Sequence, residues 1–274
     1  FCILKKNMPM LILGDIMFFT EIQKYALKFN KKKYLKLMCV PLIYIIVLAV
    51  YCVTPFLLSS LSDLILAQIS EKYSIVCSIL KCLFILISGF SACIFYSTVS
   101  LGEEAGYSGR LSGKKNRFKR FIYWFRFKNA FKAFRLKAAV FFLKLFWTLV
   151  FMLPCILTFS VVLVTAFSGG IEAYLFSALM GGTVVLFTVG LIFRFIAIQR
   201  YFLAQFILAE NPNDTVLQVI RKSKNLIDGQ IFTVVKFKLA FLPFILPCLL
   251  FIPLFFIYPH YKQSRSILAK ELTV

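Results

Sequence analysis

The chain has 274 residues, of which 61% are hydrophobic, and its mean hydropathy is +0.86. Soluble domains contain about 45–50% apolar residues, so this composition excludes an ordinary soluble domain and indicates a membrane protein. The net charge of +21 would suggest nucleic-acid binding in a soluble chain. Here the bases lie between apolar blocks, which suits the anionic cytoplasmic face of a membrane.

The first 36 residues contain eight lysines, and we expect them to form a cytoplasmic lead-in. The chain begins at Phe1, and residues 1–16 lack a clear signal-peptide cleavage pattern. A coherent pattern begins just after Met17, which makes Met17 a candidate start.

Five apolar blocks follow, and each has about the length that a helix needs to cross a bilayer. They cover residues 37–58, 75–99, 138–167, 173–198 and 239–258. No alternating strand pattern competes with them. The predicted fold class is therefore all-α, a polytopic helical membrane protein with about five membrane-embedded blocks in a single membrane domain, residues 1–274.

The bases between the blocks predict the orientation. Eleven lie in the basic loop 100–137 and six in residues 200–238, whereas the turn at residues 168–170 has none. By the positive-inside rule, the N-terminus and both basic segments are cytoplasmic.

The last block leaves two alternatives. Five full crossings would put the C-terminus outside, but the tail contains Lys262, Arg265 and Lys270, which favour the inside. Because Pro243, Pro247 and Pro253 break this block, it is either a single crossing or a re-entrant segment that other helices must bury.

Three bases fall inside or near the ends of apolar blocks: Lys81, Lys144 and Arg194. They could line a cavity or an ion pathway, since charges within a membrane are costly and often functional. Alternatively their long side chains reach the interface, because each lies near a block end. No block has a central Asp or Glu, which weakens a proton-coupled transporter.

Small residues recur every four positions at Ala173, Ser177 and Gly181. Such rows allow close helix approach in lipid. This row therefore predicts helix packing within the chain or, alternatively, a homodimer or a contact with another membrane protein.

Loop 100–137 combines aromatic residues with bases. Phe118, Phe121, Ile122 and Phe125 follow helical spacing, which predicts an interfacial helix whose bases contact anionic lipid headgroups. Those bases are Lys114, Lys115, Arg117, Lys119, Arg120, Arg126 and Lys128. Nucleic acid is the alternative partner, which attachment to membrane blocks disfavours. The glycine-rich residues 102–113 lack a phosphate-binding spacing and are expected to form a flexible loop.

Catalytic and metal sites have no support in the sequence. The eight cysteines form no C-x-x-C motif, and His260 is the single histidine, so no zinc ligand set can be assembled. No Ser-His-Asp set is apparent either. We expect no cofactor, no metal and no enzymatic activity.

A polar stretch, AENPNDTVLQVIRKSKNLIDG (209–229), separates the last two blocks. Pro212 should end the preceding helix, because the residue before a proline is pushed out of the helical region. Asn213 is the expected cap of a new helix, with Asp214 in its first turn.

This new helix is expected to be amphipathic. Val216, Ile220 and Ile227 form an apolar stripe, and Gly229 is placed to end the helix. The stretch therefore predicts a cytoplasmic interfacial helix over residues 213–228.

The same region carries a family resemblance. YFLAQFILAENPNDTVLQVIRKSKNLIDG (201–229) resembles the signature of a bacterial integral-membrane family of unknown function, number nine-seven-five in the domain-of-unknown-function series. The matching residues include Tyr201, Ala209, Glu210, Asn211, Pro212, Ser223, Gly229 and, downstream, Pro259. FWTLVFMLP (146–154) is similar to the family's Trp-containing span, and His260 stands where the family tends to have Tyr. The resemblance implies a bacterial membrane protein and no reaction.

Two functions remain in view. The first is a non-enzymatic accessory or scaffold component of the bacterial cytoplasmic membrane. The second is a transporter or permease-like subunit with a pathway near Lys81, Lys144 and the Pro-broken last block.

Overall fold

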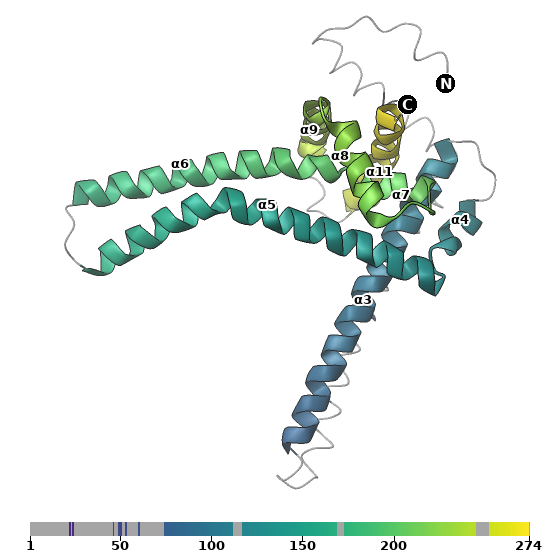
Figure 1. Ribbon diagram of the computed structural model, residues 1–274, viewed down its shortest axis with the longest axis horizontal. Helices are drawn as coiled ribbons and strands as arrows, with labels where there is room; N and C mark the ends of the chain where they lie inside the picture. The colour runs from purple at the N-terminus through teal and green to yellow at the C-terminus, as the bar shows by residue number, and fades with distance from the viewer. Residues whose placement is uncertain are drawn as a thin grey trace, which may run out of the picture. The chain divides into compact units, whose positions relative to one another are not determined.

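A computed structural model describes residues 22, 24, 46, 49, 50, 53 and 60 and the ranges 74–111, 117–168, 173–244 and 252–273 (Figure 1). All regular secondary structure in these described residues is helical. The contacts divide the chain into two compact units, residues 1–134 with 240–274, and residues 135–239.

The first unit is built on helix α3 (Ser74–Leu111). Helix α4 (Arg117–Tyr123) packs on its C-terminal half, as does helix α11 (Ile252–Thr273). The Lys270 Nζ donates a hydrogen bond to the Leu111 carbonyl, at 3.3 Å. Because the last carbonyls of a helix have no partner within it, this contact caps α3 from α11.

Residues 102–111 are helical, so the expectation of a flexible loop over 102–113 is wrong for them. Two of their glycines, Gly102 and Gly109, allow close packing instead. A methyl group added at Gly102 would lie 3.0 Å from the Phe121 ring, and one at Gly109 would lie 2.9 Å from the Arg120 Nη1. The basic segment 100–137 thus contains the end of α3, all of α4 and the beginning of α5 (Phe127–Ser168).

The second unit contains a long helical hairpin. Helix α5 continues through Pro154, and α6 (Ala173–Ile198) runs beside it in the opposite direction (Figure 1). A methyl group added at Gly190 would lie 2.7 Å from the Phe151 carbonyl oxygen. The rings of Trp147, Phe151 and Phe193 stack in series across the two helices.

Among the described residues, several short helices follow the hairpin. They include the 3-10 helix η3 (Gln199–Tyr201), α7 (Ala204–Glu210), α8 (Val216–Ile227) and α9 (Ile231–Ala240). Helix α8 packs on both α7 and η3.

The described residues contain three helical segments long and apolar enough to cross a membrane: Lys81–Gly109, Phe127–Phe167 and Tyr174–Glu210. They correspond to the predicted blocks 75–99, 138–167 and 173–198. Most of block 37–58 and part of block 239–258 lie outside the described residues, so the count of five stays a prediction, as does the single membrane domain.

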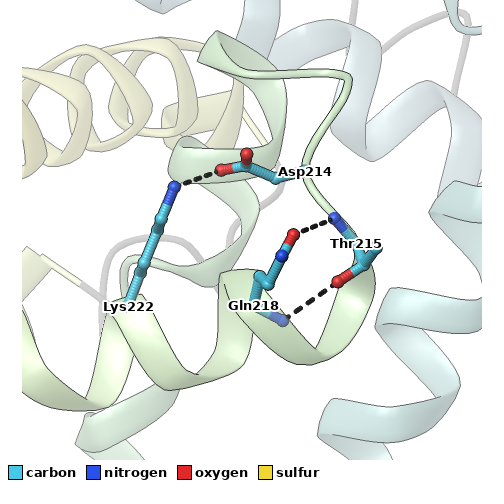
Figure 2. A network of polar contacts seen from close by, with 4 residues as sticks. All are labelled: Asp214, Thr215, Gln218 and Lys222. Atoms are coloured by element: carbon cyan, nitrogen blue, oxygen red, sulfur yellow. Dashed lines mark hydrogen bonds and ion pairs between the residues drawn. The ribbon is translucent and has the colours of Figure 1, made fainter.

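The predicted break at Pro212 is confirmed, because α7 ends at Glu210 and α8 begins at Val216. The predicted cap is wrong: the N-cap is Thr215, not Asn213. Figure 2 shows the reciprocal bonds of this capping box, in which the Gln218 N–H donates to Thr215 Oγ1 and the Thr215 N–H donates to Gln218 Oε1. Both side chains thereby satisfy backbone donors that the helix leaves free.

Asp214 lies outside the first turn of α8, and its carboxylate pairs with the Lys222 Nζ at 2.7 Å (Figure 2). The buried stripe runs through Val219, Ser223 and Ile227, with Val216 and Ile220 half-buried beside it. Gly229 follows the helix with φ +86°, as its predicted role as terminator requires.

Candidate functional site

A buried polar cluster lies near the C-terminal end of α3. Glu103 and Glu104 are 4% and 0% exposed, although carboxylates are seldom fully buried without partners. Glu103 Oε2 accepts a hydrogen bond from the Tyr258 hydroxyl at 2.8 Å and pairs with the Lys262 Nζ at 3.0 Å. Tyr258 and Lys262 are one turn apart on α11, so one face of that helix supplies both partners.

The neighbouring carboxylate has a looser partner. Glu104 Oε1 lies 3.9 Å from the Arg265 Nε, too far for a direct hydrogen bond. Two acids on α3 therefore face two bases on α11. This balance matters because a buried charge is strongly destabilising unless it is compensated.

Further polar atoms of this cluster lack hydrogen-bond partners within the described part of the chain. They belong to Glu103, Glu104, Gln263, Ser264 and Ser266, all of which are buried. Because buried polar groups are nearly always satisfied, such a concentration marks a candidate site rather than ordinary helix packing. No group of three or more metal-ligating side chains occurs among the described residues.

Sequence reasoning missed this cluster. The adjacent acids Glu103 and Glu104 were visible, but their glycine-rich surroundings suggested a loop. Their partners Tyr258, Lys262 and Arg265 come more than 150 residues later. For the tail bases Lys262 and Arg265, the sequence indicates only a preference for the cytoplasmic side.

A second polar junction lies at the end of α6, in the second unit. The Trp147 Nε1 donates to the Tyr201 hydroxyl at 3.1 Å, and the Arg200 guanidinium lies 5.9 Å from the centre of the Trp147 ring. The Ser223 hydroxyl donates to the Arg200 carbonyl at 2.9 Å. Two signature residues, Tyr201 and Ser223, therefore join α5, η3 and α8.

The other signature residues have structural positions. Ala209 is buried in α7, and Glu210, Asn211 and Pro212 form the break before α8. Gly229 ends α8, while Pro259 lies within α11 of the first unit.

A neighbouring contact involves Lys238 of α9, which the sequence did not single out. Its Nζ donates to Gln199 Oε1 and lies 5.7 Å from the centre of the Phe202 ring. The Gln199 Nε2 in turn donates to the Phe195 carbonyl at 2.7 Å. These contacts fix α9 against the end of α6.

Two of the three predicted pathway residues, Arg194 and Lys144, are linked through Thr148 in the second unit, although their side chains are not shown in contact. The Arg194 Nε donates to Thr148 Oγ1 at 2.8 Å, and the Thr148 hydroxyl donates to the Lys144 carbonyl at 2.7 Å. The Lys144 side chain itself is exposed. Lys81 belongs to α3 of the first unit.

The small residues Ser177 and Gly181 are exposed, and a methyl group at Gly181 would meet nothing within 4 Å. Within the described residues, the close approach of α5 and α6 is therefore made at Gly190 instead. Nearby lies an open apolar pocket of about 300 Å³. Its lining residues are Cys155, Phe159, Met180, Thr183, Val184 and Phe187.

The predicted headgroup-binding bases divide into two sets. Lys119, Arg126 and Lys128 are exposed, whereas Arg120 is half-buried against Gly109. Lys114 and Lys115 lie outside the described residues, as does the side chain of Arg117.

No curated protein and no solved structure matches the chain. A family model described as "Protein of unknown function (DUF975)" matches residues 109–273. This match covers more than half of the chain and contains every signature residue from Tyr201 to Pro259. The family resemblance seen in the sequence is thus confirmed, and the chain belongs to the DUF975 family of proteins of unknown function.

Proposed function

We propose that this chain is a multi-pass protein of the bacterial cytoplasmic membrane and acts there as a non-enzymatic accessory or scaffold component, with its N-terminus in the cytoplasm. The observation that carries the proposal is the apolar surface of the three long helices. On α5, Phe142 is 64% exposed and Val164 is 68% exposed. Apolar area costs about 25 cal/mol per Å² in water, so these helices need a lipid environment.

The contacts of the polar side chains support the scaffold role. Lys262 joins α11 to α3, Tyr201 joins η3 to α5, and Arg194 joins α6 to α5. In membranes, polar side chains stabilise helix association through hydrogen bonds between helices. A protein whose polar groups hold helices in a fixed arrangement is suited to presenting a stable surface.

The transporter alternative has one specific observation in its favour. Glu103 and Glu104 lie within the candidate span Lys81–Gly109 and are buried. Ionisable residues within a membrane segment are functional by default. In this alternative the acids would serve substrate or ion movement, together with Lys81 and Lys144.

A matched pair of double variants separates the two functions. Glu103→Gln with Lys262→Met removes both members of the buried pair, and replacing both partners is often nearly neutral for stability. Asp214→Asn with Lys222→Met removes an exposed pair as the control. Both are tested for restoring the phenotype of a deletion strain, normalised to membrane abundance.

The scaffold proposal predicts that each variant restores the phenotype in proportion to its amount in the membrane. This applies to both double variants and to Lys81→Leu with Lys144→Leu. Loss of restoration at unchanged abundance in the buried-pair variant, with the control intact, would contradict the scaffold proposal as stated and favour the transporter alternative. Gene neighbourhood offers an independent discriminator, since an adjacent ATP-binding cassette gene would favour transport.

A further inference from the structure

The turn that joins α4 to α5, residues 123–128, has a fixed shape, and we name it the elbow. The Phe125 N–H donates to the Ile122 carbonyl at 2.9 Å, and the Ala130 N–H donates to the Arg126 carbonyl at 2.8 Å. The Asn129 side chain donates to the Tyr123 carbonyl at 2.9 Å. These hydrogen bonds tie the turn to the end of α4 and to the beginning of α5.

Aromatic side chains anchor the elbow on its inner side. Trp124 is 1% exposed. The Phe125 ring lies 5.9 Å from the Phe95 ring of α3 and 5.2 Å from the Phe121 ring of α4, distances typical of favourable aromatic pairs. The elbow is therefore held against α3, and its outer residues have a defined direction.

The outer side combines one apolar ring with bases. Phe127 is 89% exposed, and Arg126 and Lys128 on either side of it are exposed as well. The Arg126 guanidinium lies 6.0 Å from the centre of the Tyr123 ring. A large exposed ring flanked by charges is unfavourable in water but suits a membrane interface, where rings enter the acyl boundary and bases meet headgroups.

The neighbouring apolar segments predict the depth of the elbow. The elbow packs beside Phe95, close to the end of the predicted apolar block 75–99, and the next candidate span begins at Phe127. Consecutive spans leave and re-enter a bilayer on the same side, so the elbow lies at the headgroup level. The surrounding excess of bases makes this the cytoplasmic side, whose leaflet is anionic.

We propose that the elbow binds anionic phospholipid headgroups of the cytoplasmic leaflet. Arg126, Lys128 and Lys119 contact the phosphates, and Phe127 enters the acyl boundary. Arg120 does not take part, because its guanidinium packs against α3 at Gly109. This inference rests on the proposed membrane location and adds the lipid class and the residues that recognise it.

The test titrates dioctanoyl phosphatidylglycerol into the full chain in detergent and follows the midpoint of thermal unfolding, with dioctanoyl phosphatidylcholine as the neutral comparison. A ligand that binds the folded state raises this midpoint. Each base near an anionic surface contributes about 1 kcal/mol, so Arg126→Gln with Lys128→Gln should require roughly 10- to 30-fold more phosphatidylglycerol for the same shift. The matched control is Arg221→Gln with Lys224→Gln, which removes two exposed bases from α8.

The proposal is supported if phosphatidylglycerol raises the unfolding midpoint more than phosphatidylcholine does. The elbow variant and Phe127→Ser should reduce this difference, whereas the control variant should keep it. If the elbow variant does not fold, Lys119→Gln with Lys128→Gln replaces it. Equal shifts for the two lipids, or equal weakening by elbow and control variants, would overturn the proposal. So would oligonucleotide binding that depends on Arg126 and Lys128 without a response to phosphatidylglycerol.

Membrane extraction separates this inference from the proposed function. If alkaline carbonate releases the protein from membranes without detergent, the membrane proposal fails. If extraction requires detergent but the lipid titration shows no preference, the elbow proposal fails by itself.

Discussion

At the scale of single residues, Lys262 compensates the buried charge of Glu103. Lys262→Met would leave that carboxylate with the Tyr258 hydroxyl as its remaining described partner. Removing one member of a buried pair costs about 3–5 kcal/mol, so we expect a destabilisation of about 3 kcal/mol. Chemical unfolding of the purified protein in detergent measures it.

The control is the Glu103→Gln, Lys262→Met double variant, which removes both charges and should recover most of the loss. A Lys262→Met variant as stable as the wild type would show that the pair does not hold α11 on α3.

His260 gives a pH-dependent prediction. Burial lowers the pKa of His260 below its ordinary value of 6.5. The unfolded chain therefore takes up a proton as the pH falls through 6.5, while the folded chain does not yet do so. Stability is complete above pH 6.5 and should fall below it, by at most about 1.4 kcal/mol per pH unit from this group, down to the lowered folded pKa.

Unfolding midpoints measured between pH 8 and pH 5 check this, with His260→Tyr as the comparison because the tyrosine does not titrate in that range. The centre of the imidazole ring lies 5.8 Å from the centre of the Phe241 ring, and an aromatic replacement can preserve this packing. An identical pH dependence in the two proteins would rule out His260 as its source.

Sequence reasoning identified residues whose role is local or carried by the family pattern. Gly229 was predicted from its place after an amphipathic stripe, and its φ of +86° agrees. Tyr201 and Ser223 came from the resemblance, although their contacts with Trp147 and Arg200 were not foreseen. The Glu103–Lys262 pair could not be foreseen, because no local pattern specifies which distant helix packs on α3.

At the scale of elements, the start of α8 depends on Thr215. Thr215→Ala removes the side-chain acceptor of the Gln218 N–H, and loss of such a cap costs about 1 kcal/mol. Asn213→Ala is the matched control, since Asn213 precedes the helix and should cost little. The unfolding midpoints of the two variants are compared in detergent. A larger loss of stability for Asn213→Ala than for Thr215→Ala would show that Asn213 is the N-cap, as expected from the sequence.

The signal for this cap was present in the sequence. Thr215 and Gln218 are spaced as a capping box, and the apolar residues follow directly. Asn213 is also a residue type that caps helices, and it would place Asp214 in the first turn, where the helix dipole favours negative charge. The pattern T-x-x-Q is more specific than a single cap-forming residue, because it satisfies two backbone donors reciprocally.

The hairpin of α5 and α6 gives a second prediction for an element. Gly190→Ala would put a methyl group 2.7 Å from the Phe151 carbonyl oxygen, so the helices must separate. We expect a loss of about 1–3 kcal/mol, the range typical of overpacking. Gly181→Ala is the control, because its methyl group would meet nothing within 4 Å.

Thermal unfolding of both variants in detergent measures the difference. If Gly181→Ala were the more damaging variant, then the row of small residues that contains Gly181 would form a packed interface with another chain. The result therefore also decides between hairpin packing and the homodimer alternative.

The apolar helices were the most predictable elements, because α5 and α6 have the length and continuous hydropathy of membrane spans. Helix α3 extends beyond its predicted block to Leu111. Its last 12 residues are polar and glycine-rich, and they are helical where α4 and α11 pack on them. Hydropathy cannot anticipate a helix whose burial is supplied by distant segments.

At the scale of the whole molecule, the contacts of the tail predict the side of the membrane on which the C-terminus lies. The Lys270 Nζ reaches the Leu111 carbonyl at 3.3 Å, and Lys262 pairs with Glu103 at 3.0 Å. The end of α11 therefore lies beside the C-terminal end of α3. By the positive-inside rule, the bases that follow α3 predict that this end is cytoplasmic.

We therefore expect a reporter fused after Val274 to report the cytoplasm, and insertions after Gly113 and after Gly170 to report inside and outside as controls. Since residues 200–238 are also expected inside, block 239–258 would then enter and leave on one side, as its three prolines allow where other helices bury the backbone. An outside signal after Val274, with both controls as expected, would require a full crossing. The contacts of Lys262 and Lys270 with α3 could not then exist in the membrane, because the two helix ends would lie on opposite faces.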